Sequence, residues 1–204
     1  MNSSLRVVGL TGGIASGKSC VSKAFRNADI PVLDADSLGH MVLEPDGEAY
    51  DEVIHAFGTG ILNDDRTINR QRLGKMVFDN EAERKKLESI THPAIAALAQ
   101  KGMELISASG APFAVYEAAL LVETGIYRGM DALVVVSTTL ENQLVRLCAR
   151  DQISKKDAVT RIACQYPLDQ KLKVADYVIE NNGTYAELEK AALEVASRLK
   201  AQFS

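Results

Sequence analysis

The residues best suited to chemistry lie near the N-terminus, where the chain matches the pattern GxxxxGK(S/T) with Gly12-Gly13-Ile14-Ala15-Ser16-Gly17-Lys18-Ser19. Glycines at these positions let successive backbone N–H groups point into one concavity that binds phosphate oxygens. In such loops the lysine reaches the β- and γ-phosphates, and the hydroxyl of the last residue is a Mg²⁺ ligand. The pattern therefore predicts a nucleotide phosphate site with Ser19 as its metal ligand. This turn lacks a GxGxxG pattern, which disfavours a dinucleotide-binding dehydrogenase.

Carboxylates follow the second predicted strand, as Asp34-Ala35-Asp36. In a parallel sheet the carboxyl ends of the strands face the same crevice as the phosphate loop. A carboxylate there can accept the proton of a substrate hydroxyl or hold Mg²⁺ through water. Asp36 can equally cap the next helix, because Asp favours caps. Glu117 closes a further predicted strand and is either a metal-orienting acid or a strand-terminal surface acid.

Arg146 and Arg150 lie four residues apart, so they share one face of a predicted helix. Fixed arginines stabilise the charge that phosphoryl transfer spreads over the transferring group. Most charged helical residues simply face water, and that alternative stays open for both. The three histidines, His40, His55 and His92, show no metal-binding spacing, so no histidine metal centre is expected. His92 precedes Pro93, and the helical pattern is expected to end there.

Short, nearly continuous apolar runs alternate with helical patterns, which is typical of a parallel sheet buried on both faces. The predicted strands are residues 5–11, 30–33, 113–116, 132–136 and 177–179, and a helix is predicted over 17–27. Capping boxes are predicted at Thr138–Glu141, Ser154–Asp157 and Thr184–Glu187. The last helix carries an apolar stripe, which predicts that one face packs on the sheet.

Two stretches break this alternation. Residues 37–111 are rich in helical pattern and far longer than a minimal crossover, which predicts an inserted helical subdomain. Residues 140–174 hold two charged helices, and a charged helical hairpin here is suited to be a lid. Residues 1–36, 112–139 and 175–204 would then form the nucleotide-binding core. The expected class is α/β, a three-layer phosphate-loop fold on a five-stranded parallel sheet.

The composition excludes several classes of protein. With 23 basic and 27 acidic residues and a net charge of −4, the 204-residue chain is not a general nucleic-acid binder. The three cysteines form no CxxC pair, which fits a reducing cytoplasm, and the apolar runs are too short to span a membrane. The oligomeric state cannot be predicted from these features.

Taken together, the motifs resemble the dephospho-CoA kinase family. The resemblance begins with the phosphate loop and Asp34-Ala35-Asp36, and it continues through motifs along nearly the whole chain: Ile68-Asn69-Arg70, Leu73-Gly74, Ile90-Thr91-His92-Pro93-Ala94-Ile95, Leu120-Leu121-Val122-Glu123, Gln143-Leu144-Val145-Arg146-Leu147, Arg150-Asp151 and Ala175-Asp176-Tyr177-Val178-Ile179-Glu180-Asn181-Asn182-Gly183. It implies ATP-dependent phosphorylation of the ribose 3′-hydroxyl of dephospho-CoA, with ATP and Mg²⁺ as cofactors.

The resemblance also implies residue roles. Asp36 would be the base, Lys18 and the loop amides up to Cys20 would hold ATP, and Arg150 would reach the phosphates. Arg146 and Asn181 would also lie at the nucleotide, the latter near the adenine. The substrate side would comprise His40, Arg70, His92 and Leu121.

The chain departs from the family pattern before the Leu-Leu pair. The family usually has an aspartate and a proline where this chain has Glu117 and Ala119, and Val122 replaces an aromatic residue. Two other functions are weighed against the family. A GTPase-type switch is suggested by the DxxG match at residues 36–39 but lacks an NKxD motif. A related kinase acting on a sugar or a nucleotide would share the loop and the lid arginines.

Overall fold

The computed structural model describes residues 5–78 and 80–203, and the chain forms two compact units. The first unit comprises residues 1–34 and 103–204, and the second comprises residues 35–102. In the described part of the first unit, a parallel sheet has the strand order β2-β3-β1-β4-β5. The strands are β1 (Arg6–Gly12), β2 (Val32–Asp34), β3 (Phe113–Glu117), β4 (Ala132–Ser137) and β5 (Tyr177–Glu180). The predicted five-stranded α/β class is thus confirmed.

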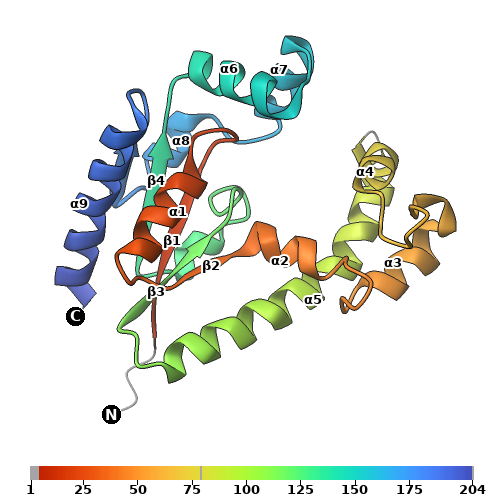
Figure 1. Cartoon of the computed structure of the whole chain (residues 1–204), viewed down its shortest axis with the longest axis horizontal. Helices are drawn as coiled ribbons and strands as arrows, with labels where there is room; N and C mark the ends of the chain where they lie inside the picture. Colours follow the sequence, from red (N-terminus) through yellow and green to blue (C-terminus); the bar gives the residue numbers. More distant parts are fainter. Residues whose placement is uncertain (1–4, 79, 204) are drawn as a thin grey trace. The chain divides into compact units, whose positions relative to one another are not determined.

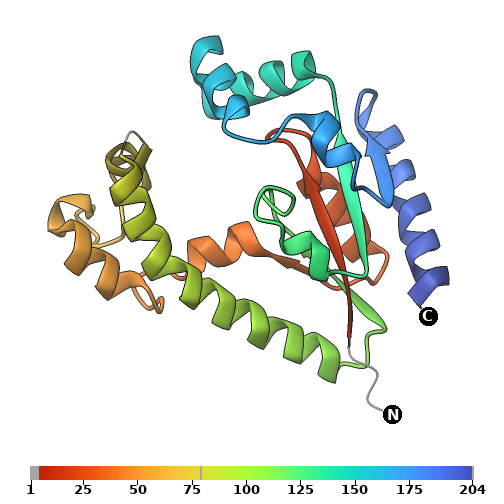
Figure 2. The ribbon, with the colours of Figure 1, turned by 180° about the vertical axis from the view of Figure 1, so that it is seen from behind.

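The central strands are buried because helices cover both faces of the sheet. On one face, Val8, Leu10, Val115 and Val134 pack against α1 (Lys18–Asn27) and α9 (Tyr185–Phe203), which lie beside each other (Figure 1). On the other, alternate residues such as Leu133 and Val135 pack against the segment after β3 and α8 (Leu168–Leu172). Figure 2 shows the ribbon of this face from behind. Burial on both faces explains the continuous apolar runs.

Several sequence motifs have a structural role in this unit. Asp176 Oδ2 accepts a hydrogen bond from the N–H of Leu133, which fixes the start of β5 beside β4. The capping box at Thr184–Glu187 is confirmed by reciprocal hydrogen bonds between side chain and backbone N–H. At Ser154–Asp157 the serine hydroxyl accepts the Asp157 N–H and donates to the Asp157 carboxylate, so Ser154 is the predicted N-cap but its own N–H is not bound by Asp157. The box predicted at Thr138–Glu141 is wrong. Thr139 is the N-cap of α6 (Leu140–Asp151), because Thr138 Oγ1 instead donates to the Asn181 carbonyl.

The segment predicted to be a lid, residues 140–174, forms α6, α7 (Lys155–Ala163) and α8, and is called the lid region below. The short helix η2 (Ile126–Gly129) precedes β4. The two charged helices predicted in this segment are separated at Gln152, which adopts a left-handed conformation. Among the described residues, no helix combines the length and apolarity needed to cross a bilayer.

The second unit is helical in its described residues, apart from a single bridge between Leu62 and Ile68. It contains α2 (Ala35–Met41), α3 (Tyr50–Phe57), η1 (Thr59–Ile61), α4 (Arg70–Phe78) and most of α5 (Glu81–Ala108). Its separate core includes Val42, Val53, Phe57 and Leu73. The helix end predicted at His92 is wrong, because α5 continues through Pro93. One missing hydrogen bond does not end this long helix, whose Ala94 packs into the core beyond the proline.

Candidate nucleotide site

The phosphate loop bends sharply between β1 and α1, and its residue types match that geometry. Gly17 has a φ of 99° and precedes the first residue of α1. A Cβ on Gly17 would lie 2.2 Å from Asn181 Nδ2, so both the backbone angle and the close approach require glycine. Ala15 also adopts a left-handed conformation, with a φ of 58°. The loop therefore carries a strained alanine between its glycines.

The predicted phosphate ligands lie at the start of α1. Lys18 Nζ donates to the Gly12 carbonyl at 3.3 Å, so the lysine side chain folds back over the loop. Ser19 is exposed in the first helical turn, where the helix dipole also attracts anions. Cys20 is half-buried and packs against the main core. The phosphate loop, Lys18 and Ser19 therefore all lie at the N-terminal end of α1.

Glu117 ends β3 beside this helix and is 5% exposed. Burial raises the pKa of its carboxyl group, and a hydrogen bond donated by Ser22 of α1 partly offsets that rise. The nearby Asp34 raises the Glu117 pKa further, whereas Lys18 and Arg26 lower it. Two carboxylates and the phosphate-loop lysine therefore share an electrostatic environment at one edge of the sheet.

Arg146 of α6 is connected to the phosphate loop through Asn181. Its guanidinium donates to the Asn181 carbonyl at 3.1 Å and to Asn181 Oδ1 at 3.3 Å. Asn181 Nδ2 in turn donates to the Ser16 carbonyl at 2.7 Å. The two residues assigned to the nucleotide by resemblance are thus brought together against the loop.

Arg150 lies one turn farther along α6 and pairs with Asp151 at 2.7 Å. Arg161 of α7 binds the same carboxylate at 2.6 Å, and these arginines lower the Asp151 pKa, chiefly through the Arg150 hydrogen bond. Asp151 therefore holds two lid arginines together in this structure.

Two glutamines that the sequence does not single out contact the loop directly. Gln165 Oε1 accepts the Ile14 N–H at 2.7 Å, and Gln143 Nε2 donates to the Ile14 carbonyl at 2.8 Å. Gln143 opens one of the motifs that carry the family resemblance, but that motif assigned it no role. Nothing in the sequence pattern pointed to Gln165.

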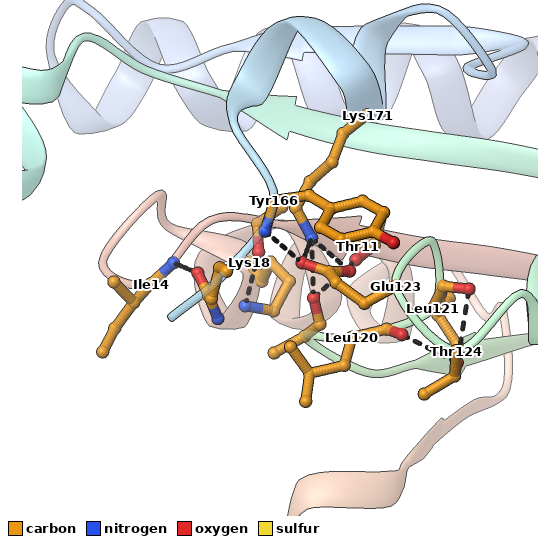
Figure 3. A network of polar contacts seen from close by, with 12 residues as sticks. Thr11, Ile14, Lys18, Leu120, Leu121, Glu123, Thr124, Tyr166 and Lys171 are labelled. Carbon is orange, nitrogen blue, oxygen red and sulfur yellow. Dashed lines mark hydrogen bonds and ion pairs between the residues drawn. The ribbon is translucent and has the colours of Figure 1, made fainter. Parts of the chain in front are cut away.

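A buried ion pair supports the segment that carries Gln165 (Figure 3). Lys171 Nζ lies 2.6 and 2.8 Å from the two Glu123 oxygens, and the lysine side chain is 0% exposed. Glu123 also accepts the Tyr166 N–H at 2.9 Å. The Ala119 carbonyl accepts bonds from both Lys171 and Thr11, which joins this ion pair to the end of β1.

A cavity of about 560 Å³ lies between the loop, the end of β4 and the lid helices. Gln143, Gln165 and Lys171 line it, as does Ser16. The Ser16 hydroxyl is buried and has no hydrogen-bond partner among the described residues.

In the helical unit, Arg70 and His40 lie close together although they are distant in sequence. Arg70 donates to the His40 carbonyl at 3.1 Å and pairs with Glu44 at 3.2 Å. Asp36 is exposed in the first turn of α2, and His92 is exposed on α5. These positions leave the side chains of Asp36, His40 and His92 at the surface of their own unit.

Leu121 belongs to the core rather than to the surface. It is 1% exposed and packs with Val122, Leu133 and Val135. The exposed leucine of the pair is Leu120, at 45%.

The family model for dephospho-CoA kinase matches residues 6–187. The dephospho-CoA kinase of Geobacter sulfurreducens is 43% identical over 94% of this chain and 97% of its own length.

Two solved structures resemble the fold over most of both chains. A Thermus thermophilus protein superposes with a TM-score of 0.82 and 31% identity, covering 97% of this chain and 99% of its own. The dephospho-CoA kinase of Campylobacter jejuni superposes with a TM-score of 0.69 and 28% identity, covering 95% of this chain and 96% of its own.

Proposed function

Because this chain belongs to the dephospho-CoA kinase family, we propose that it transfers the γ-phosphoryl group of ATP to the ribose 3′-hydroxyl of dephospho-CoA, giving CoA and ADP. The family match spans the phosphate loop, the helical unit and the lid region, so it concerns more than a generic nucleotide site. The reaction is the final step of coenzyme A synthesis. We assign it to the cytoplasm, where free thiols such as Cys20, Cys148 and Cys164 stay reduced.

ATP binds with its phosphates in the phosphate loop. Backbone N–H groups of the loop other than that of Ile14, together with Lys18 and the dipole of α1, attract the phosphate oxygens. Arg146 and Asn181 lie beside the loop and contact the nucleoside side of ATP. Arg150 exchanges its Asp151 partner for the phosphates when the lid closes, and there it stabilises the charge of the transferring group.

Asp36 is the base in this proposal. It follows β2, whose carboxyl end lies at the same edge of the sheet as the phosphate loop. Its carboxylate accepts the proton of the 3′-hydroxyl while the hydroxyl oxygen bonds to the γ-phosphorus. The bond from that phosphorus to the bridging oxygen of ADP breaks in the same displacement. His40, Arg70 and His92 bind the CoA side of the substrate, whereas Leu121 is buried in the core of the first unit and makes no such contact.

The donor chemistry at the loop fits Mg²⁺. The exposed Ser19 hydroxyl is a hard oxygen ligand, and the carboxylates of Glu117 and Asp34 lie near the same helix. Among the described residues no cluster of three acidic, histidine or cysteine side chains forms a complete metal site. Mg²⁺ commonly takes few protein ligands and completes its shell with phosphates and water. When bound, it would neutralise charge on the β- and γ-phosphates, with Ser19 as its ligand from this chain.

The deciding experiment measures ADP release from ATP with dephospho-CoA, adenosine or shikimate as the acceptor. Of the three acceptors, we expect only dephospho-CoA to cause rapid ADP release, with one CoA formed for each ADP. Turnover with shikimate instead would identify a related phosphate-loop kinase. GTP hydrolysis without an acceptor would support the GTPase-type switch and contradict the proposal.

A further inference from the structure

We propose that Gln143 and Gln165 are positioning residues that clamp Ile14 and hold the phosphate loop in the conformation that accepts ATP. The proposal rests on the ATP site proposed above, and it adds a function for two side chains outside the phosphate-loop motif. Neither glutamine needs to touch the nucleotide for this role.

The two carboxamides bind the same residue, one from the beginning of the α6–α7 segment and the other from just after its end. Gln143, on α6, donates to the Ile14 carbonyl, and Gln165, just after α7, accepts the Ile14 N–H. The direction of each bond follows from its backbone partner, because an N–H can only donate and a carbonyl can only accept. Gly13 leaves room for this contact, since a Cβ there would lie 2.3 Å from Gln143 Nε2.

The clamped residue directly precedes the strained part of the loop. Ala15 has a φ of 58°, a left-handed conformation that non-glycine residues avoid. Such strain persists only where surrounding contacts hold the backbone in place. Two hydrogen bonds that fix both polar groups of Ile14 supply that restraint immediately before Ala15.

Each glutamine is itself anchored to the core. Gln143 lies one turn from Arg146, which binds Asn181. Gln165 precedes Tyr166, whose N–H binds Glu123, and Glu123 pairs with the buried Lys171 (Figure 3). The clamp is therefore built from fixed parts rather than from mobile surface side chains, which is what preorganisation of a binding loop requires.

Loss of either bond should weaken ATP binding, because the nucleotide would then have to order the loop itself. We expect Gln143→Met and Gln165→Met each to raise the Kd for ATP about three- to tenfold, the range that one hydrogen bond is worth. The KM for dephospho-CoA should change less than twofold. Gln170→Met, an exposed substitution on α8, is the matched control and should leave both constants unchanged.

The Ala15→Gly substitution separates loop positioning from general stabilisation. Glycine adopts the left-handed conformation without strain, so a loop with Gly at this position depends less on the clamp. Each Gln→Met change should therefore weaken ATP binding less in the Ala15→Gly background than in the wild type. Equal losses in the two backgrounds would contradict the proposal.

Glutamate variants test the hydrogen-bond directions at constant added charge. Gln165→Glu keeps an acceptor for the Ile14 N–H, whereas Gln143→Glu places a carboxylate against the Ile14 carbonyl. ATP should bind more weakly to the Gln143→Glu variant than to the Gln165→Glu variant, and equal affinities would refute the clamp.

Binding is measured by titration calorimetry without acceptor, and circular dichroism checks that each variant is folded. Unchanged ATP affinity in both methionine variants would overturn the proposal. Higher ATP affinity in both would also overturn it, because the carboxamides would then compete with phosphate for the loop. A wild-type protein that binds ATP but does not phosphorylate dephospho-CoA would contradict the proposed function alone, and the clamp would still be tested by the same ATP titrations.

Discussion

The Lys171–Glu123 pair offers the sharpest test of how this fold supports its site. Lys171 is 0% exposed, and its ammonium group makes three hydrogen bonds, two to Glu123 and one to the Ala119 carbonyl. All three of its N–H protons are thereby used. In Lys171→Met the apolar stem is retained, but Glu123 keeps only the Tyr166 N–H at 2.9 Å as a partner among these contacts.

The expected cost of Lys171→Met is about 3–5 kcal/mol of unfolding free energy, because removing one member of a buried ion pair leaves an uncompensated charge. For a chain of this size that loss corresponds to a fall of roughly 6–20 °C in Tm. The double variant Lys171→Met/Glu123→Gln should recover most of the loss. It buries no charge, and the glutamine oxygen can still accept the Tyr166 N–H.

Urea unfolding followed by circular dichroism measures these differences. The matched control is Lys173→Met, because Lys173 pairs with Asp169 at 3.5 Å while 72% exposed, and such pairs contribute about 0.5 kcal/mol or less. A Lys171→Met variant as stable as this control would refute the reasoning. So would a double variant no more stable than Lys171→Met alone, since the loss would then not come from the stranded Glu123 charge.

Three further substitutions test the site. Lys18→Ala should reduce kcat/KM about 10²–10³-fold without changing the unfolding midpoint. The control Lys23→Ala, an exposed change on the same helix, should leave kcat/KM unchanged, and near-normal turnover of Lys18→Ala would exclude the role of Lys18. Asp36→Asn should lower kcat about 10²–10⁴-fold with little change in ATP affinity. The control Asp51→Asn, at an exposed position, should leave kcat unchanged. If Asp36→Asn weakened only ATP binding, a metal or capping role for Asp36 would be favoured instead. Burial raises the pKa of Glu117 above its usual 4.5, so the folded state takes up more protons and loses stability as the pH rises through the raised pKa. Relative to the wild type, Glu117→Gln should therefore gain stability from pH 4 to 7 in urea unfolding, and a pH-independent difference would contradict this.

The sheet could be predicted from sequence because its physical signal is local. A strand buried on both faces needs a continuous apolar run, and each predicted run coincides with an observed strand to within one or two residues. Cap positions were predictable only where no tertiary contact competes. Thr138 has the right spacing for a capping box, but its hydroxyl binds the Asn181 carbonyl instead. Pro93 misled for a similar reason, since the packing of Ala94 outweighs one lost helical bond.

The same distinction between local signals and tertiary contacts applies to the site. The phosphate loop was predictable because its function depends on consecutive residue types and backbone angles. Its supports were not, because Gln165 lies 151 residues from Ile14 and Lys171 lies 48 residues from Glu123. No spacing rule relates such pairs, and a glutamine or a lysine on a polar helix is normally exposed. Only the folded chain shows which polar side chains are turned inward.

Two of the three departures from the family pattern, at positions 117 and 119, contribute to the site in different ways. At position 119 the fold uses the main-chain carbonyl, which accepts bonds from Thr11 and Lys171. Every residue has that carbonyl, so alanine in place of proline costs this network no hydrogen bond. At position 117 the fold uses the side chain itself, which accepts the Ser22 hydroxyl and lies near Lys18. The extra methylene of Glu117 relative to aspartate therefore changes the reach of a carboxylate beside the phosphate loop.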